Sequence, residues 1–178
     1  MTVQIRALGP DDADALHEFF AGVPVEDRTF FKEDVADPAV AQGWVADRRS
    51  VRRLALDPDG TIVAFAALSP GVQRTSHVAD LRLVVSGRAR GRGLGLAVAR
   101  EMLLAAVGHG YKKVTVDIAA DRTGPIAMFQ ALGFVPEALL RDQLCDPNGD
   151  LHDLVVLAHR VDDTWASMVT SGIADGVG

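Results

Sequence analysis

Three arginines and three glycines lie within one short segment, Arg-Ala-Arg-Gly-Arg-Gly-Leu-Gly at positions 88–95. Glycines let a backbone approach a ligand closely, and arginines add charge-assisted hydrogen bonds. A helix that starts just after the glycines would add unpaired N–H groups and the positive end of its dipole. Residue types in this order favour the binding of an anion, above all a phosphate group.

Two common phosphate motifs can be tested against this segment. A P-loop needs a Lys-Ser/Thr pair after its second glycine, and no such pair follows these glycines. The dinucleotide motif Gly-x-Gly-x-x-Gly also fails, because a start at Gly91 or Gly93 puts a leucine or a valine at its last position. The pattern that fits is Arg/Gln-x-x-Gly-x-Gly, with Arg90, Gly93 and Gly95.

With this pattern the chain resembles the GNAT superfamily of acetyl-coenzyme A (acetyl-CoA)-dependent N-acetyltransferases. The preceding segment Leu-Arg-Leu-Val-Val-Ser, residues 81–86, resembles the central strand of the family. Further along, Ala-Leu-Gly-Phe at 131–134 resembles its second conserved motif. The resemblance extends over residues 3–161. It implies transfer of an acetyl group from acetyl-CoA to a primary amine, on a small molecule or a protein, by direct attack through a tetrahedral intermediate.

The resemblance also implies where acetyl-CoA is held. Its pyrophosphate would bind backbone N–H groups between Arg90 and Gly95, and its pantetheine arm would pair with Leu83 to Val85 as an added strand. A β-bulge would open the sheet there, and a backbone N–H near Val84 or Val85 would hold the oxyanion. The expected cofactor-binding residues are Leu83, Val84, Val85, Arg90, Gly91, Arg92, Gly93, Leu94, Gly95, Arg122 and Phe129. The alternative is that the arginines form a solvated turn, since not all of them can face one pyrophosphate.

Two positions depart from the family pattern. When Gly133 and Phe134 anchor the second motif, Phe129 stands where the family commonly has a tyrosine, and Arg122 stands where it has an asparagine. Phe129 cannot donate a proton to the departing thiolate. A thiol has a pKa near ~8.5, so the thiolate can leave without full protonation. An acyl-CoA-binding or sensing module with a degenerate catalytic site therefore remains an alternative to an enzyme.

Proton removal from the acceptor is the harder demand. An alkylamine with a pKa of about 10.4 is mostly protonated near neutrality, so a carboxylate or a water chain must take a proton. Asp80 on the central strand is the first candidate for this catalytic role, with His77 beside it. The alternative is that Asp80 is paired with Arg82 or another arginine.

By the same resemblance, the first helices would line the cleft in which the acceptor amine binds. Their acidic residues could attract a cationic amine and their aromatic residues could line a pocket: Glu26, Asp27, Glu33 and Asp34, and Phe30, Phe31 and Trp44. The alternative is that the acids cover solvated helix faces and the aromatics belong to the core. No metal site is expected, because the histidines form no close ligand pair and Cys145 has no Cys-x-x-Cys partner.

Composition indicates the protein class. The 178 residues fit one domain, residues 1–162, followed by a tail, 163–178, that we expect to be mobile. A net charge of −6 argues against a nucleic-acid partner. A single cysteine and the lack of a signal peptide favour a reducing, cytoplasmic location. The longest apolar run, 62–68, is too short for a membrane span. A homodimer is left open.

Elements that would position these residues follow from periodicity and turn residues. Strands are expected at 2–7, 51–56, 61–68, 78–85, 113–119, 135–145 and 151–161. Helices are expected after Pro10, Pro24 and Pro38, after the glycine segment, and after Gly124, while Ser-Pro-Gly at 69–71 should break the third strand. The order predicts an α+β (mixed α/β) domain. With the resemblance, it becomes a central, mostly antiparallel twisted sheet, splayed between strands 4 and 5 and flanked by helices.

Overall fold

The structure, a computed structural model, describes residues 3–28, 31 and 33–162. Its strands are β1 (Gln4–Ala7), β2 (Val51–Leu56), β3 (Ile62–Pro70), β4 (Val78–Val85), β5 (Lys113–Ala119), β6 (Val135–Cys145) and β7 (Leu151–Arg160). Its α-helices are α1 (Ala13–Ala21), α2 (Val25–Arg28), α3 (Pro38–Ala46), α4 (Leu94–Gly108) and α5 (Thr123–Ala131). Three short 3-10 helices are η1 (Pro10–Asp12), η2 (Gln73–Thr75) and η3 (Gly87–Ala89). This is the predicted order of elements; the predicted tail lies outside the described residues.

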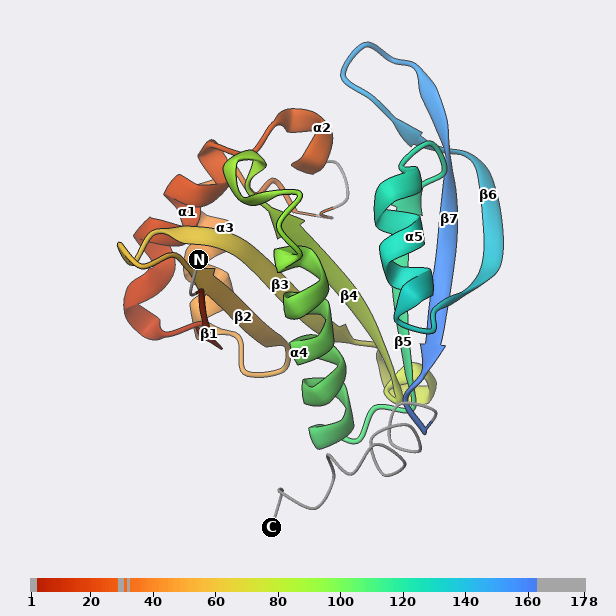
Figure 1. Ribbon diagram of the computed structural model, residues 1–178, viewed down its shortest axis with the longest axis horizontal. Helices are drawn as coiled ribbons and strands as arrows, with labels where there is room; N and C mark the ends of the chain where they lie inside the picture. The colour runs from red at the N-terminus through yellow and green to blue at the C-terminus, as the bar shows by residue number, and fades with distance from the viewer. Residues whose placement is uncertain (1–2, 29–30, 32, 163–178) are drawn as a thin grey trace.

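All seven strands form one sheet in the order β1-β2-β3-β4-β5-β7-β6. Every neighbouring pair is antiparallel except β4 and β5, which are parallel and joined through α4. Helix α4 packs on β2, β3 and β4, and α1 packs on α3 and β3 (Figure 1). The predicted fold class, a mixed α+β domain with a sheet flanked by helices, is confirmed.

Two clusters of buried side chains cover the two faces of this sheet. Leu81 of β4 packs with Met102 of α4 in one cluster, whereas Val84 of β4 packs with Phe20 and Trp44 in the other. Successive side chains of a strand point to opposite faces, so β4 contributes to both clusters. The odd-numbered residues of β4 therefore face α4, and the even-numbered residues face the α1 and α3 layer.

Strands β4 and β5 separate soon after they meet. They pair only from Val78–Lys113 to Asp80–Thr115, and both continue beyond that point. Figure 1 shows the two strands together at one end and apart at the other. The predicted splay is confirmed, but the predicted β-bulge is wrong. The β3–β4 pairing runs without a shift from Pro70–Ala79 to Ala64–Val85, so divergence of β5 alone opens the sheet.

The expected break of β3 at residues 69–71 is also wrong. Ser69 and Pro70 continue the strand and pair with Asp80 and Ala79. The neighbouring strand β2 ends its pairing with β3 at Leu68. Beyond that point β3 is an edge on the β2 side, where the missing N–H of a proline leaves no ladder bond unmade.

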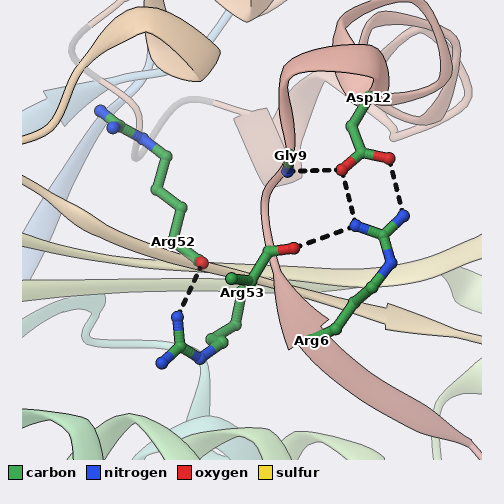
Figure 2. Close-up of polar contacts among 6 residues, drawn as sticks. Arg6, Gly9, Asp12, Arg52 and Arg53 are labelled. Atoms are coloured by element: carbon green, nitrogen blue, oxygen red, sulfur yellow. Dashed lines mark hydrogen bonds and ion pairs between the residues drawn. The ribbon is translucent and has the colours of Figure 1, made fainter.

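Asp12 ties the first strand to the turn that follows it. Its two carboxylate oxygens accept hydrogen bonds from Arg6 Nη1 and Nη2, at 2.6 and 2.7 Å, and Oδ2 also accepts from the Gly9 N–H at 2.6 Å (Figure 2). This bidentate, charge-assisted geometry is the strong kind of ion pair. The contact holds η1, and with it the start of α1, against the end of β1.

Removing this charge should destabilise the fold in a pH-dependent way. The hydrogen bond from Arg6, opposed by burial, lowers the pKa of Asp12 below its ordinary value of 3.8. A carboxylate whose pKa is lowered by folding stabilises the protein above its unfolded pKa and loses that contribution as pH falls through its folded pKa. We expect Asp12→Asn to reduce the free energy of unfolding by about 1 kcal/mol near neutral pH, and by less below about pH 4.

Urea unfolding at neutral and acidic pH measures this difference. Asp11→Asn is the matched control, because it removes the same charge from an exposed neighbour. Equal losses of stability in the two variants would contradict a specific role for the Arg6–Asp12 pair.

Candidate active site

A cavity of about 590 Å³ opens where β4 and β5 diverge. Strand β4, the glycine segment at the start of α4, strand β5 and helix α5 line it. The predicted cofactor residues that line it are Leu83, Val84, Val85, Arg90, Gly91, Gly93, Leu94, Gly95, Arg122 and Phe129. Arg92 is exposed and is not part of this lining. The structure thus brings residues from three separate segments of the chain together at one cavity.

Backbone groups of β4 alternate between strand β3 and this cavity. The N–H of Ser86 donates to Val63 O, and the N–H of Gly71 donates to Val78 O, each at 2.9 Å. In an antiparallel pair such hydrogen-bonded positions recur at every second residue. Even-numbered residues of β4 therefore bond to β3, and the N–H of Val84 points away from the cavity. The N–H groups of Leu83 and Val85 point toward the side where β5 has moved away.

The glycine segment exposes backbone N–H groups at the head of α4. Gly91 and Gly93 have φ values of +72° and +76°, a conformation that favours glycine, and Gly93 is the N-cap of α4. A Cβ at either position would meet no protein atom within 4 Å, so their surfaces are open to a ligand. The N–H groups of the first helical turn have no partner within the helix. The Arg90 N–H, in contrast, bonds Gly87 O at 3.3 Å.

Gly95 has a different role in the same segment. A Cβ at this position would lie 3.2 Å from Met128 Sδ, tighter than ordinary van der Waals contact. The glycine therefore lets the first turn of α4 approach α5 across the end of the cavity.

Two arginines of the segment form ion pairs with different acidic partners. Arg88 Nη2 lies 3.1 Å from Asp57 Oδ2, and Arg90 Nη2 lies 2.6 Å from Asp27 Oδ2. Arg90 Nε also donates to Val85 O at 3.0 Å. Of the three side chains, Arg90 alone lines the cavity. The structure thus contains both readings of the segment, one arginine at the site and two on the solvated turn.

Asp27 connects two of the three arginines that line the cavity. Its side chain, only 13% exposed, contacts Arg90 through Oδ2 and lies 3.4 Å from Arg122 Nη1 through Oδ1. Sequence reasoning placed Asp27 on the acceptor side, whereas the structure places it in the lining of the larger cavity. Asp27 and Arg90 are 63 residues apart, so no local pattern could have shown this contact.

A second cavity of about 300 Å³ shares three lining residues with the first: Phe31, Asp80 and Arg82. Asp80 and Arg82 are even-numbered residues of β4 and lie on the face of the α1 and α3 layer. Arg82 Nε donates to Asp80 Oδ2 at 2.9 Å. Asp80 therefore lines both cavities and is paired with Arg82, and its catalytic role stays a prediction.

Only some of the other residues singled out from the sequence line one of the two cavities. Phe31, Glu33 and Trp44 line the second cavity, whereas Glu26 and Asp34 line neither. His77 is exposed and also lines neither cavity. Phe30 lies outside the described residues. Two lining residues that sequence reasoning missed are Asp117 of β5, in the larger cavity, and Arg52 of β2, in the smaller one.

The two departures from the family pattern both reach the larger cavity. Phe129 is buried and packs edge-on against Phe134, with ring centroids 5.1 Å apart. Its phenyl ring offers no proton donor there. Arg122 is the N-cap residue of α5 and puts a positive charge at the place of the expected amide.

The described residues form neither a metal-binding cluster nor a membrane-spanning helix. In the described part of the chain, no set of three or more His, Cys, Asp or Glu residues is placed to hold a metal ion. Within the same residues, no helix has the length and apolar character that crossing a membrane requires.

The fold resembles solved acetyltransferase structures. An acetyltransferase of the GNAT family from Streptococcus pneumoniae superposes with a TM-score of 0.80 at 20% identity, over 89% of this chain and 99% of that one. A phosphinothricin acetyltransferase from Sinorhizobium meliloti, solved with acetyl-CoA, has a TM-score of 0.77 at 21% identity, over 90% and 89%. A GCN5-related N-acetyltransferase from Kribbella flavida has a TM-score of 0.76 at 24% identity, over 89% and 97%.

The sequence itself carries the same assignment. The pattern of the Acetyltransferase (GNAT) family matches residues 15–134, from α1 through the glycine segment to the end of the turn after α5. This range includes both motifs that the sequence analysis singled out. The chain belongs to the GNAT acetyltransferase family.

Proposed function

We propose that this protein is an N-acetyltransferase that transfers the acetyl group of acetyl-CoA to a primary amine by direct attack. The observation that carries the proposal is the opening of the sheet beside the glycine segment. Beyond Asp80, β4 no longer pairs with β5, and a cavity of about 590 Å³ extends from this unpaired edge of β4 to the start of α4. Family membership and the acetyl-CoA in the Sinorhizobium meliloti structure support the same reading.

The lining fits the parts of acetyl-CoA. The backbone N–H groups from Gly91 to Leu96, with the Arg90 guanidinium, would hold the pyrophosphate, because glycines without side chains and a helix N-terminus suit that anion. The backbone of Leu83 and Val85 would bind the amides of the pantetheine arm. The N–H of Val85, which points away from β3, would hold the oxyanion.

Asp80 is the group we assign to proton removal from the acceptor amine. It lies at the junction of the two cavities, where an amine bound in the smaller cavity would face a cosubstrate in the larger one. A carboxylate within reach of an ammonium group can accept its proton. Acetyl-CoA supplies an activated acyl group and a thiolate that leaves with little help, so Phe129 in place of a tyrosine is compatible with turnover.

A second function is favoured by Phe129 and Arg122 together. Neither residue supplies the groups that the family pattern has at these positions. A protein that binds acyl-CoA without turning it over, as a sensing module, would keep the glycine segment and the strand edge while having lost the catalytic groups.

One pair of measurements separates the two functions. Both predict that acetyl-CoA raises the melting temperature, because a ligand that binds only the folded state stabilises it. Only the enzyme should release free thiol when a panel of primary amines is added. Stabilisation without thiol release would favour the sensing module. If acetyl-CoA neither stabilised the protein nor gave binding heat, both functions would be wrong.

Asp27 should weaken the binding of acetyl-CoA. Its carboxylate lines the larger cavity and already bonds Arg90, so it competes with a phosphate group for the same guanidinium. We expect Asp27→Asn to tighten acetyl-CoA binding by about 3- to 10-fold in calorimetric titrations at low salt, with a smaller gain at high salt.

Asp59→Asn is the control for the change in net charge, because Asp59 is exposed in the β2–β3 turn and does not line the cavity. Weaker binding in Asp27→Asn would show instead that Asp27 mainly positions Arg90 for the cosubstrate.

A further inference from the structure

The smaller cavity contains an arginine that the proposed reaction does not use. Arg52 of β2 is 8% exposed and lines this cavity. Its Nη1 donates to Trp44 O at 3.2 Å and to Asp47 Oδ2 at 2.9 Å. Its Nε is buried and has no hydrogen-bond partner among the residues that the structure describes. Protein atoms cover Nε, so a ligand in the cavity can reach only the small exposed part of the Arg52 side chain.

The strand register places Arg52 in a row with the catalytic end of the cavity. Arg52 pairs with Ala67 of β3, and Ala67 pairs with Arg82 of β4. The three side chains therefore project from the same face of the sheet. Neighbouring strands are about 4.8 Å apart, which puts the Cα atoms of the two arginines about 10 Å apart. The methyl group of Ala67 leaves the space between them open.

Charges are divided along this cavity. Asp80 and Arg82 lie at the end that it shares with the larger cavity, whereas Arg52 and Glu33 line the smaller cavity only. Trp44 forms part of an apolar wall, with Arg52 Cζ 5.4 Å from its ring centroid. Each end thus carries one cation and one anion, so a ligand with an amine and a carboxylate meets a group of opposite sign at both ends.

We propose that the acceptor is a small amine that also carries a carboxylate, such as a free amino acid. Its carboxylate binds the part of the Arg52 guanidinium that reaches the cavity, through a charge-assisted hydrogen bond. Its amine lies beside Asp80, at the opening to the larger cavity. This substrate class rests on the proposed acetyltransferase function. A protein lysine would supply the amine but no anion for Arg52.

Matched pairs of acceptors test the proposal on the wild-type protein. The acceptors are L-leucine, L-phenylalanine and 4-aminobutanoate, each compared with its carboxamide in an assay of thiol release from acetyl-CoA. The carboxamide keeps the shape and the position of the amine but removes the negative charge, and in 4-aminobutanoate the amine is too far from that group for its basicity to change much. Loss of a hydrogen-bonded charge pair is worth about 10- to 100-fold. We therefore expect kcat/KM to be at least about tenfold higher for one or more acids than for the matched carboxamide.

Two neighbouring arginines provide the variants. Figure 2 shows that Arg52 and Arg53 leave β2 in opposite directions, and Arg53 Nε lies 3.9 Å from Glu101 of α4 on the other face. Arg52→Gln should remove the preference for the acid over its carboxamide. Arg53→Gln should keep the preference. Calorimetric titration of the wild-type protein with the same acids and carboxamides, with CoA present, measures binding without turnover. This measurement tests the acceptor site even if the Arg52 variant folds poorly.

The outcomes distinguish this inference from the proposed function. The proposal of a carboxylate-bearing acceptor would be overturned if carboxamides or a lysine peptide were acetylated as fast as every acid. The protein would still be an N-acetyltransferase in that case. Acid preference unchanged in Arg52→Gln would overturn the role of Arg52. Absence of thiol release with every acceptor would count against the proposed acetyltransferase function. The titrations would then test the acceptor site by themselves. Equal binding of acids and carboxamides, or no binding of either, would overturn the carboxylate-binding site.

Discussion

Replacing Gly93 by valine is expected to weaken acetyl-CoA binding by about 100-fold, the loss of one or two charge-assisted hydrogen bonds. Gly93 caps α4 with a φ of +76°, and its open side faces the cavity. A β-branched residue is strained in this conformation, and its side chain would occupy the space next to the N–H groups that would hold the pyrophosphate. Calorimetric titration with acetyl-CoA measures the effect.

Gly60→Val is the matched control for this substitution. Gly60, in the β2–β3 turn, has a φ of +80°, and a Cβ there would also meet nothing within 4 Å. Both substitutions should therefore cost a similar stability, about 1–2 kcal/mol. Gly60→Val should bind acetyl-CoA as the wild type does. Equal affinity in the two variants would contradict the role of the glycine segment as an anion site.

Asp80→Asn is expected to lower kcat by about 100- to 10,000-fold, the range typical of a lost general base. The amide keeps the size of the side chain but accepts no proton. Acetyl-CoA affinity should stay close to that of the wild type, because the cosubstrate is held by the glycine segment and the backbone of β4. The readouts are the amine-dependent rate of thiol release and the dissociation constant of acetyl-CoA, measured on the same preparation.

Two further variants decide between Asp80 and the other candidates. Asp117→Asn tests the carboxylate on the β5 side of the larger cavity. His77→Ala tests the histidine that sequence reasoning placed beside Asp80; it lines neither cavity, so we expect its kcat to be near that of the wild type. If Asp80→Asn kept the wild-type kcat and one of these two variants lost most of it, the residue changed in that variant would be the general base instead of Asp80.

Local signals account for the part of the fold that sequence reasoning predicted well. The strand, glycine turn and helix of residues 78–108 follow each other directly, so each element specifies the start of the next. Asp37 before Pro38 predicted a helix start, and the Asp37 side chain does accept from the Ala39 N–H at 2.8 Å. Such caps involve residues a few positions apart, and composition and spacing show them.

Contacts between distant strands account for what sequence reasoning missed. The row of Arg52, Ala67 and Arg82 exists only once two strand registers are known. In the same way, Asp27 reaches Arg90 and Arg122 because α2, the glycine segment and the start of α5 meet at one cavity. No spacing within a single segment carries this information, since register depends on which faces of several strands are buried together.

The β-bulge shows the limit of inference from a family. It was expected from the resemblance alone, and the continuous pairing of β3 with β4 excludes it here. The sheet still opens, because β5 leaves β4 after Asp80. The opening was therefore predicted correctly, while the structural device that produces it was not.

Hydrogen exchange with and without acetyl-CoA tests most directly whether the opening between β4 and β5 is the cosubstrate site. We predict that acetyl-CoA slows exchange of the amides of Leu83 and Val85 and of residues 91–96, because these N–H groups would gain acceptors from the pantetheine amides and the pyrophosphate. The edge strand β6, far from the opening in sheet order, should exchange at the same rate in both states. Protection confined to other parts of the chain, or no protection at saturating acetyl-CoA, would contradict this site.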